Sequence, residues 1–216
     1  MAREPCQKGT SFLPVVGALK AHPDRNKLVP ERLRQYFDHH LVISGWYPEK
    51  DYFALLEALV KTIDAKSVGG DVWRYFAQFS VKRDLAGAAA SGSGSSEPKG
   101  VYRNFVPADG GDLEPFFRRA MKLWSQYHDT GTMQLRGGRA SKNVVVVQLV
   151  GFFIPIDGFV KLQGYYLEEF GRLVGIKLES HVTQSTARGS ARCEWEYTLA
   201  RTPASEAYVA SLPAVS

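Results

Sequence analysis

The residues most suggestive of chemistry are Asp129-Thr130-Gly131, the triplet that aspartic proteases use. In those enzymes two such aspartates share one proton, because like charges a few ångström apart cannot both ionise. Here the triplet follows a helical pattern that ends at Tyr127-His128, and the sequence places no nucleophile beside it. We therefore interpret the triplet as a turn that leaves a helix. His128 fits the same interpretation, since the helix dipole favours a histidine at a helix C-terminus.

Zinc binding is the second chemistry that the residue types allow. His39 and His40 are adjacent, so on a helix their side chains point about 100° apart, and neither has a histidine partner four positions away. Cys193 shares the apolar face of an expected strand with Trp195, whereas His181 lies on a polar strand face. We expect no metal site, and we expect Cys193 to be a buried structural cysteine.

Composition and charge indicate an ordinary soluble domain. The chain has 216 residues, 23% of them charged, and a net charge of +5. The basic residues are scattered and form no stripe, so we expect no specific nucleic-acid partner. The apolar run 144–147 is far shorter than the roughly 20 residues that span a bilayer, so we expect no transmembrane segment. The N-terminus lacks the apolar core of a signal peptide, and Cys6 and Cys193 lie far apart, which indicates a cytoplasmic protein.

The apolar pattern changes from a helical period to a strand period along the chain. Helical spacing predicts helices over residues 30–40, 48–63, 71–84, 112–127 and 159–175. A period of two then predicts a hairpin of 133–136 and 143–151 around a glycine turn at Gly137-Gly138, and a last hairpin of 176–184 and 193–199. The strand from residue 143 is apolar on both faces and is expected at the centre of the sheet.

These elements predict an α+β fold, in which N-terminal helices pack on a small, mainly antiparallel sheet with a C-terminal helix and hairpin. We expect a single domain over residues 1–201. Residues 86–99 contain no large apolar side chain, so we expect a flexible insertion there. The Pro-, Ala- and Ser-rich segment 202–216 is expected to be a loosely ordered tail.

Several stretches, in order along most of the chain, resemble a paralogous family of bacterial proteins that is numerous in myxobacteria and related to the 4-vinyl reductase domain. The closing A-x-G-x-x-x-C-x-W pattern on the final hairpin is the most specific of them. The matching stretches are Lys8-Gly9, Ser44-Gly45-Trp46-Tyr47-Pro48, Leu55-Leu56-Glu57-Ala58-Leu59, Gly100-Val101-Tyr102-Arg103-Asn104-Phe105, Leu123-Trp124, Tyr127 to Gly131, Gly151-Phe152, Ala187-Arg188-Gly189 and Cys193 to Tyr197.

The wider superfamily also resembles haem-based nitric-oxide sensors and small subunits of the TRAPP tethering complex, so the resemblance implies helices on a small antiparallel sheet. Two features depart from its ligand-binding branches. Relatives that bind zinc near the last hairpin carry a cysteine where this sequence has Ser185. The Tyr-Ser-Arg signature and the axial histidine of the haem-binding branch cannot be placed here. We therefore expect neither zinc nor haem, and no other cofactor.

These observations favour a non-enzymatic ligand-binding or sensory and regulatory module with an apolar pocket between helices and sheet. We expect Trp46, Tyr47, Trp124, Tyr127 and Phe152 to form the pocket wall, with ordinary core packing as the alternative for each. The ligand implied by such a wall is a small apolar or aromatic molecule. We also expect a homodimer.

Two other functions remain open. The resemblance to TRAPP subunits implies a protein-interaction scaffold or adaptor that recruits a small GTPase or a cytoskeletal partner, and a large exposed apolar patch would favour it. The 4-vinyl reductase name implies an enzyme that acts on a tetrapyrrole-like substrate. The sequence contains no phosphate-binding glycine loop, esterase elbow or covalent haem motif, so we expect no catalytic residues and rank the enzyme last.

Overall fold

The structure is a computed structural model that describes residues 4–90 and 112–215. The chain forms two units, Met1–Val72 with Trp124–Gly131, and Trp73–Leu123 with Thr132–Ser216. The single domain that the sequence predicts over 1–201 stays a prediction. Residues 124–131 belong to the first unit, where His128 forms an isolated bridge with Gln7.

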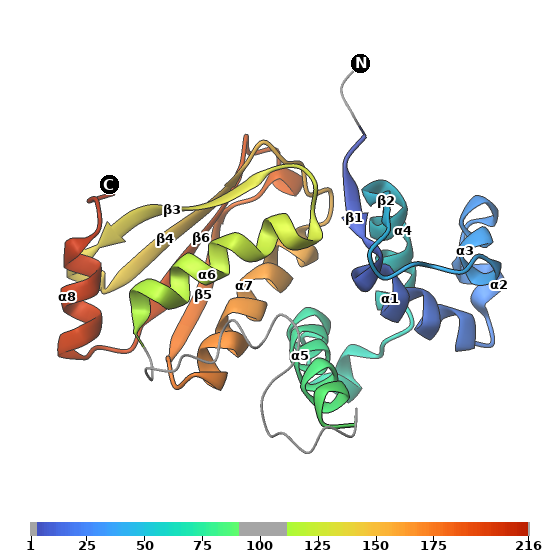
Figure 1. Ribbon diagram of the computed structural model, residues 1–216, viewed down its shortest axis with the longest axis horizontal. Helices are drawn as coiled ribbons and strands as arrows, with labels where there is room; N and C mark the ends of the chain where they lie inside the picture. Colours follow the sequence, from blue (N-terminus) through green and yellow to red (C-terminus); the bar gives the residue numbers. More distant parts are fainter. Residues whose placement is uncertain (1–3, 91–111, 216) are drawn as a thin grey trace. The chain divides into compact units, whose positions relative to one another are not determined.

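The first unit contains short helices and a two-stranded sheet (Figure 1). β1 (Cys6–Lys8) pairs antiparallel with β2 (Trp46–Pro48). The helices are α1 (Gly9–Ala21), α2 (Arg25–Leu28), α3 (Gln35–Asp38) and α4 (Glu49–Val60). α4 confirms the helix expected from residue 48, whereas the helix expected over 30–40 is reduced to a 3₁₀ turn and α3. The sequence pattern did not indicate α1, which has Pro14 in its interior.

Phe12 of α1 is the centre of this unit's aromatic core. Its ring centroid lies 5.5, 5.2 and 5.4 Å from those of Tyr36, Tyr47 and Tyr52. The Tyr36 hydroxyl donates a hydrogen bond to the Asp51 carboxylate at 2.8 Å. Burial, reinforced by this carboxylate, raises the pKa of Tyr36, so the hydroxyl remains a donor.

The second unit is built on a four-stranded antiparallel sheet (Figure 1). Its strands are β3 (Thr132–Arg139), β4 (Val144–Val150), β5 (Leu178–Gln184) and β6 (Cys193–Leu199), in the order β3-β4-β6-β5. β4 is central, as its apolar character on both faces predicts. The last hairpin is also confirmed, with Gly189 at a φ of 87° in its turn.

Helices cover one face of this sheet. They include α6 (Leu113–Tyr127) and α7 (Asp157–Leu173), both close to the ranges expected from helical spacing, and α5 (Val72–Ala90) belongs to the same unit. Trp195 and Tyr197 point to the same side of β6, because strand side chains alternate. The Trp195 indole donates to the Val160 carbonyl of α7 at 2.8 Å, and the Tyr197 ring packs edge-on against Phe117 of α6. The apolar core of this unit therefore lies between the sheet and these two helices.

Charged side chains occupy the opposite face of the sheet. The Glu194 carboxylate is buried and accepts from Arg136 at 2.9 Å, with the Arg192 guanidinium at 3.4 Å. Arg139 forms an ion pair with Glu196 on the same face. Ion pairs thus contribute to the cover of this side, so an apolar ligand site is expected on the side of the helices.

The glycines at 137 and 138 do not form the turn that the sequence predicts. β3 runs through both with a bulge just before Gly137, and the chain reverses at the 3₁₀ turn Ala140–Lys142 and at Asn143, whose φ is 54°. A Cβ at Gly137 would lie 2.1 Å from the carbonyl oxygen of Pro213. Because these two glycines have no side chain, the C-terminal segment can pack directly against the strand.

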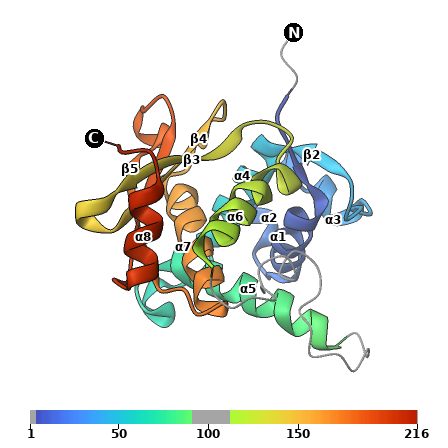
Figure 2. The ribbon, with the colours of Figure 1, turned by 60° about the vertical axis from the view of Figure 1, so that its left-hand side comes forward.

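The loose tail expected from residue 202 is instead an anchored helix, α8 (Pro203–Ser211). Thr202 and Ser205 cap it reciprocally, each side-chain oxygen accepting from the other's backbone N–H, and Val209 is 1% exposed. Beyond the helix, the Gly138 N–H donates to Pro213 at 2.9 Å. Figure 2 shows α8 beside this end of β3. Composition alone predicts a loose segment here, because it contains no information about the Thr202–Ser205 cap or the burial of Val209.

The insertion expected over 86–99 is described only in part. α5 extends to Ala90, so residues 86–90 are helical, whereas residues 91–99 lie outside the described part of the chain. Within the described ranges, no helix combines the length and the apolar character that crossing a membrane requires.

We expect Gly137→Ala and Gly17→Ala to change the free energy of unfolding in opposite directions. Alanine at 137 meets a backbone oxygen and a strained φ of 154°, and should cost about 2–4 kcal/mol. Gly17 lies within α1 with open space around its Cβ position, and alanine there should add about 0.5–1 kcal/mol. Urea unfolding of both variants measures this, and a neutral Gly137→Ala would contradict the close approach of the C-terminal segment.

Candidate functional site

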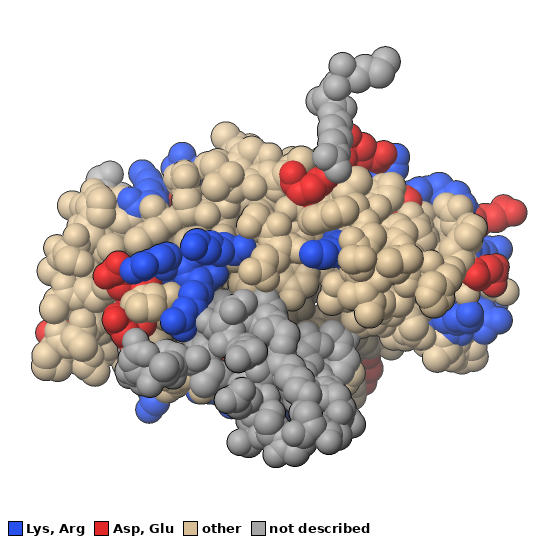
Figure 3. All heavy atoms as spheres, viewed as in Figure 1, with Lys and Arg blue, Asp and Glu red and all other residues tan. Residues whose placement is uncertain are grey.

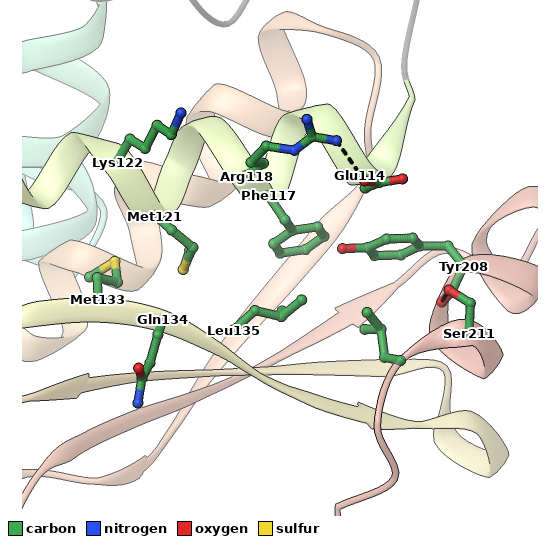
Figure 4. A pocket seen from close by; sticks show the side chains of 11 residues that line it. Glu114, Phe117, Arg118, Met121, Lys122, Met133, Gln134, Leu135, Tyr208 and Ser211 are labelled. Atoms are coloured by element: carbon green, nitrogen blue, oxygen red, sulfur yellow. Dashed lines mark hydrogen bonds and ion pairs between the residues drawn. The ribbon is translucent and has the colours of Figure 1, made fainter.

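A hollow of about 510 Å³ opens in the second unit, between α6, α8 and β3 (Figure 4). Its volume is in the range of pockets that bind small molecules. Eleven residues line it: Glu114, Phe117, Arg118, Met121, Lys122, Met133, Gln134, Leu135, Tyr208, Ser211 and Leu212. Most of the wall is apolar, and each of the three elements contributes to it.

α6 turns its apolar side toward the hollow and its charged side away. Phe117 and Met121 are four positions apart and extend from the same side of the helix, toward β3 (Figure 4). Arg118 and Lys122 follow them by one position, and their charged ends lie on the outer side of the helix (Figure 4). Lys and Arg side chains accordingly gather over α6 in Figure 3. Arg118 also pairs with Glu114 at 2.5 Å, so the hollow's interior remains apolar.

β3 supplies the opposite wall through strand alternation. Met133 and Leu135 point toward α6, while Gln134 between them points to the other side of the strand (Figure 4). Leu135 pairs with Val147 in the sheet, which places it on the helix-covered face. Because β3 is an edge strand, the wall that it forms is open on one side.

Tyr208 of α8 closes one end of the hollow. Its ring lies nearly parallel to that of Phe117, with centroids 5.8 Å apart and an interplanar angle of 11°, and its hydroxyl leads toward the space between α6 and β3 (Figure 4). That hydroxyl makes no hydrogen bond to any residue that the structure describes. Burial, together with the carboxylates of Glu114 and Asp112, raises the pKa of Tyr208 to about 12. The hydroxyl is therefore protonated at neutral pH and can donate a hydrogen bond.

The structure places four of the five expected wall residues in the first unit. Trp46 is 40% exposed on β2, with the Lys8 ammonium 5.6 Å from its ring centroid. Tyr47 beside it packs on Phe12, and its hydroxyl oxygen accepts from the Val42 N–H at 2.8 Å. Each of these two side chains thus has a partner within its own unit.

Trp124 and Tyr127 share the last turns of α6. Trp124 is buried, its ring stacks on His128 with centroids 3.6 Å apart, and its indole donates to the Thr130 carbonyl at 2.8 Å. Phe152 follows β4 in the second unit and is 8% exposed. None of the five is among the residues that line the hollow, so their role in a pocket wall stays a prediction.

The sequence pointed to part of the hollow under another interpretation. Helical spacing predicts the helix over 112–127, and Phe117 and Met121 of this helix line the hollow. Tyr208 and Leu212 were missed because they lie within segment 202–216, which was expected to be loose. The Thr202-Pro203 pair was the available signal, since Thr at a cap and Pro at the first helical position mark a helix start.

Asp129-Thr130-Gly131 attaches a turn to β1. Asp129 accepts from the Cys6 N–H at 2.7 Å through its side chain and donates its own N–H to the Cys6 carbonyl. His128 is buried, and its Nδ1 lies 2.6 Å from Glu49 Oε1 at the start of α4. Throughout residues 4–90 and 112–215, no three His, Cys, Asp or Glu side chains converge as a metal site requires. The contacts of this segment support its interpretation as a turn.

Neither a protein-family model nor a curated protein matches the chain. Among solved structures, it is similar to an H-NOX protein from S. oneidensis at 11% identity, covering 90% of this chain and 96% of that one, with a TM-score of 0.49. H-NOX proteins from T. tengcongensis and K. algicida match at 10% identity over 91% of this chain and 99% and 98% of theirs, both with a TM-score of 0.47. At these scores the function has to be argued from the chain's own residues.

Haem does not fit the hollow. Its lining includes no histidine and no cysteine, the side chains that most often ligate haem iron. No step of the proposed function involves haem.

We expect His128→Phe to destabilise the protein by about 2–4 kcal/mol, because it leaves the buried Glu49 carboxylate without its partner. Phenylalanine preserves a ring for stacking on Trp124. His40→Phe is the matched control, since His40 is exposed and its replacement should change stability by less than about 0.5 kcal/mol. Urea unfolding compares the two, and equal effects would show that the pair with Glu49 contributes nothing.

Proposed function

We propose that the chain is a non-enzymatic ligand-binding module of sensory or regulatory type, and that a small apolar molecule occupies the hollow between α6, α8 and β3. The observation that carries the proposal is a hollow of this size with a mostly apolar wall. Concave, mostly apolar surfaces with a few polar groups are typical of sites that bind small molecules.

The chemistry of the wall favours binding over catalysis. Phe117, Leu135 and Leu212 provide dispersion contacts, and Met121 and Met133 provide flexible side chains that adapt to a ligand's outline. Burial of apolar ligand surface against such a wall contributes about 25 cal/mol per Å². The ionic groups at the rim are directed outward or paired with each other, so they do not form an acid–base pair inside the hollow.

We expect the neutral dye N-phenylnaphthylamine to fluoresce more strongly on binding to this chain, and Leu135→Trp to weaken its binding by at least about tenfold, because the indole fills the hollow. Glu179→Trp is the control, since Glu179 is exposed on the other edge strand and does not line the hollow. Fluorescence titration measures both. The proposal fails if the unchanged protein does not bind the dye, or if Leu135→Trp binds it equally well.

One observation favours the scaffold function as a second candidate. In the first unit a turn presents Val42 and Ile43 outward, 51% and 63% exposed, with Trp46 nearby in sequence. The turn is ordered, because the Gly45 N–H donates to Val42 and the Thr10 N–H donates to Ile43. Adjacent exposed aliphatic side chains on a fixed backbone are typical of a protein contact.

We propose that this turn joins two copies of the chain in a homodimer. Light scattering during size exclusion should give twice the mass of one chain, and replacing both Val42 and Ile43 with serine should give the mass of one chain. Phe153→Ser is the control: Phe153 is 65% exposed but belongs to the second unit, so its replacement should leave the dimer intact. A monomeric unchanged protein would exclude the dimer, and a dimer in the serine variant would exclude this turn as its contact.

A further inference from the structure

We propose that the ligand of the hollow is a neutral aromatic molecule with a hydrogen-bond acceptor, and that the Tyr208 hydroxyl selects it by donating to that acceptor. The inference rests on the proposed function and specifies the class of ligand. Three features of the hollow support it, one for each property of the ligand.

The first feature is the set of side chains that favours an aromatic ring. Phe117 and Tyr208 present two nearly parallel rings at one end of the hollow. Met121 and Met133 place thioethers on the opposing walls of α6 and β3 (Figure 4). Aromatic rings stabilise one another in offset stacks, and thioether sulfur makes favourable contacts at ring edges. A flat ring therefore finds suitable partners on both walls.

The second feature is a hydrogen-bond donor that no described residue accepts from. The Tyr208 hydroxyl has no hydrogen-bond partner among the described residues, although its side chain is half-buried and directed into the hollow (Figure 4). A polar group that loses water without gaining a partner costs free energy, so an apolar ligand that displaces water here is disfavoured unless it accepts a hydrogen bond. A carbonyl or ether oxygen on the ligand satisfies this donor.

The third feature is the charge around that donor. The carboxylates of Glu114 and Asp112 both act on Tyr208, and they raise its pKa in addition to the effect of burial. The opposing cation, Arg118, is paired with Glu114, and the charged end of Lys122 lies on the outer side of α6. An anionic group in the hollow would lose its water without gaining a cation that points inward, so the site favours a neutral acceptor.

Three naphthalenes with a substituent at the same ring position test the proposal: the acetyl compound, the ethyl compound and the carboxylate. The three compounds are similar in size. The acetyl compound is a neutral hydrogen-bond acceptor, the ethyl compound has no acceptor, and the carboxylate is an anion. Affinities are measured on the full chain by displacement of N-phenylnaphthylamine. We expect the acetyl compound to bind about fivefold to tenfold more tightly than the ethyl compound, and the carboxylate to bind most weakly.

Tyr208→Phe removes a single oxygen and keeps the ring that stacks on Phe117, so the fold is preserved. In this variant the acetyl compound should lose its advantage and bind like the ethyl compound, whose affinity should not change. Tyr75→Phe is the matched control, because Tyr75 is 38% exposed on α5 and does not line the hollow. It should leave all three affinities unchanged.

The outcomes separate this inference from the proposed function. If the dye itself does not bind, the proposed function fails and the inference fails with it. If the dye and the ethyl compound bind but the acetyl compound has no advantage, or keeps it in Tyr208→Phe, only the inference is overturned. Tightest binding by the carboxylate also overturns it, because the ligand would then be an anion.

Discussion

The arrangement of the second unit depends on two positions in β3 that have no side chain. A Cβ at Gly137 would lie 2.1 Å from Pro213 O, and a Cβ at Gly138 would lie 2.7 Å from Val209 O. Without this space α8 and the residues after it could not approach the strand. The helix that Thr202 and Ser205 cap would then have no surface to pack against. α8 in turn supplies Tyr208, so the hollow exists because a strand edge contains two glycines.

Local patterns predicted the elements that bury one clear apolar face. α4, α6, α7 and the central β4 all follow from spacing alone, since each depends on side chains that repeat along its own length. The failures involve distant partners. A Gly-Gly pair between apolar segments is typical of a turn, and nothing near it in the sequence shows that Pro213 needs the space. The bridge between Gln7 and His128 likewise joins residues that are far apart in the sequence.

The candidate site was harder to predict than the fold, for a related reason. Abundant aromatic residues suggested a pocket wall, but aromatic residues are also the usual filling of a core, and Tyr47 and Trp124 have stacking and hydrogen-bond partners of their own. What distinguishes Tyr208 is a hydroxyl with no hydrogen-bond partner among the described residues, a property of the packed molecule that residue type does not encode. Phe117 and Met121 lie in a helix that spacing predicts, while the open space beside them depends on where α8 lies.

The position of Tyr208 on α8 makes ligand occupancy and helix docking two coupled equilibria. A molecule bound between Phe117 and Tyr208 contacts α6 and α8 together. The binding site is therefore complete only when α8 is docked on β3. Ligand binding then increases the free energy needed to undock α8 from β3. By thermodynamic reciprocity, undocking of α8 must weaken ligand binding by the same factor. The rate of hydrogen exchange of the α8 amides would therefore report whether the hollow is occupied. The capped helix is the element whose docking changes when a ligand binds.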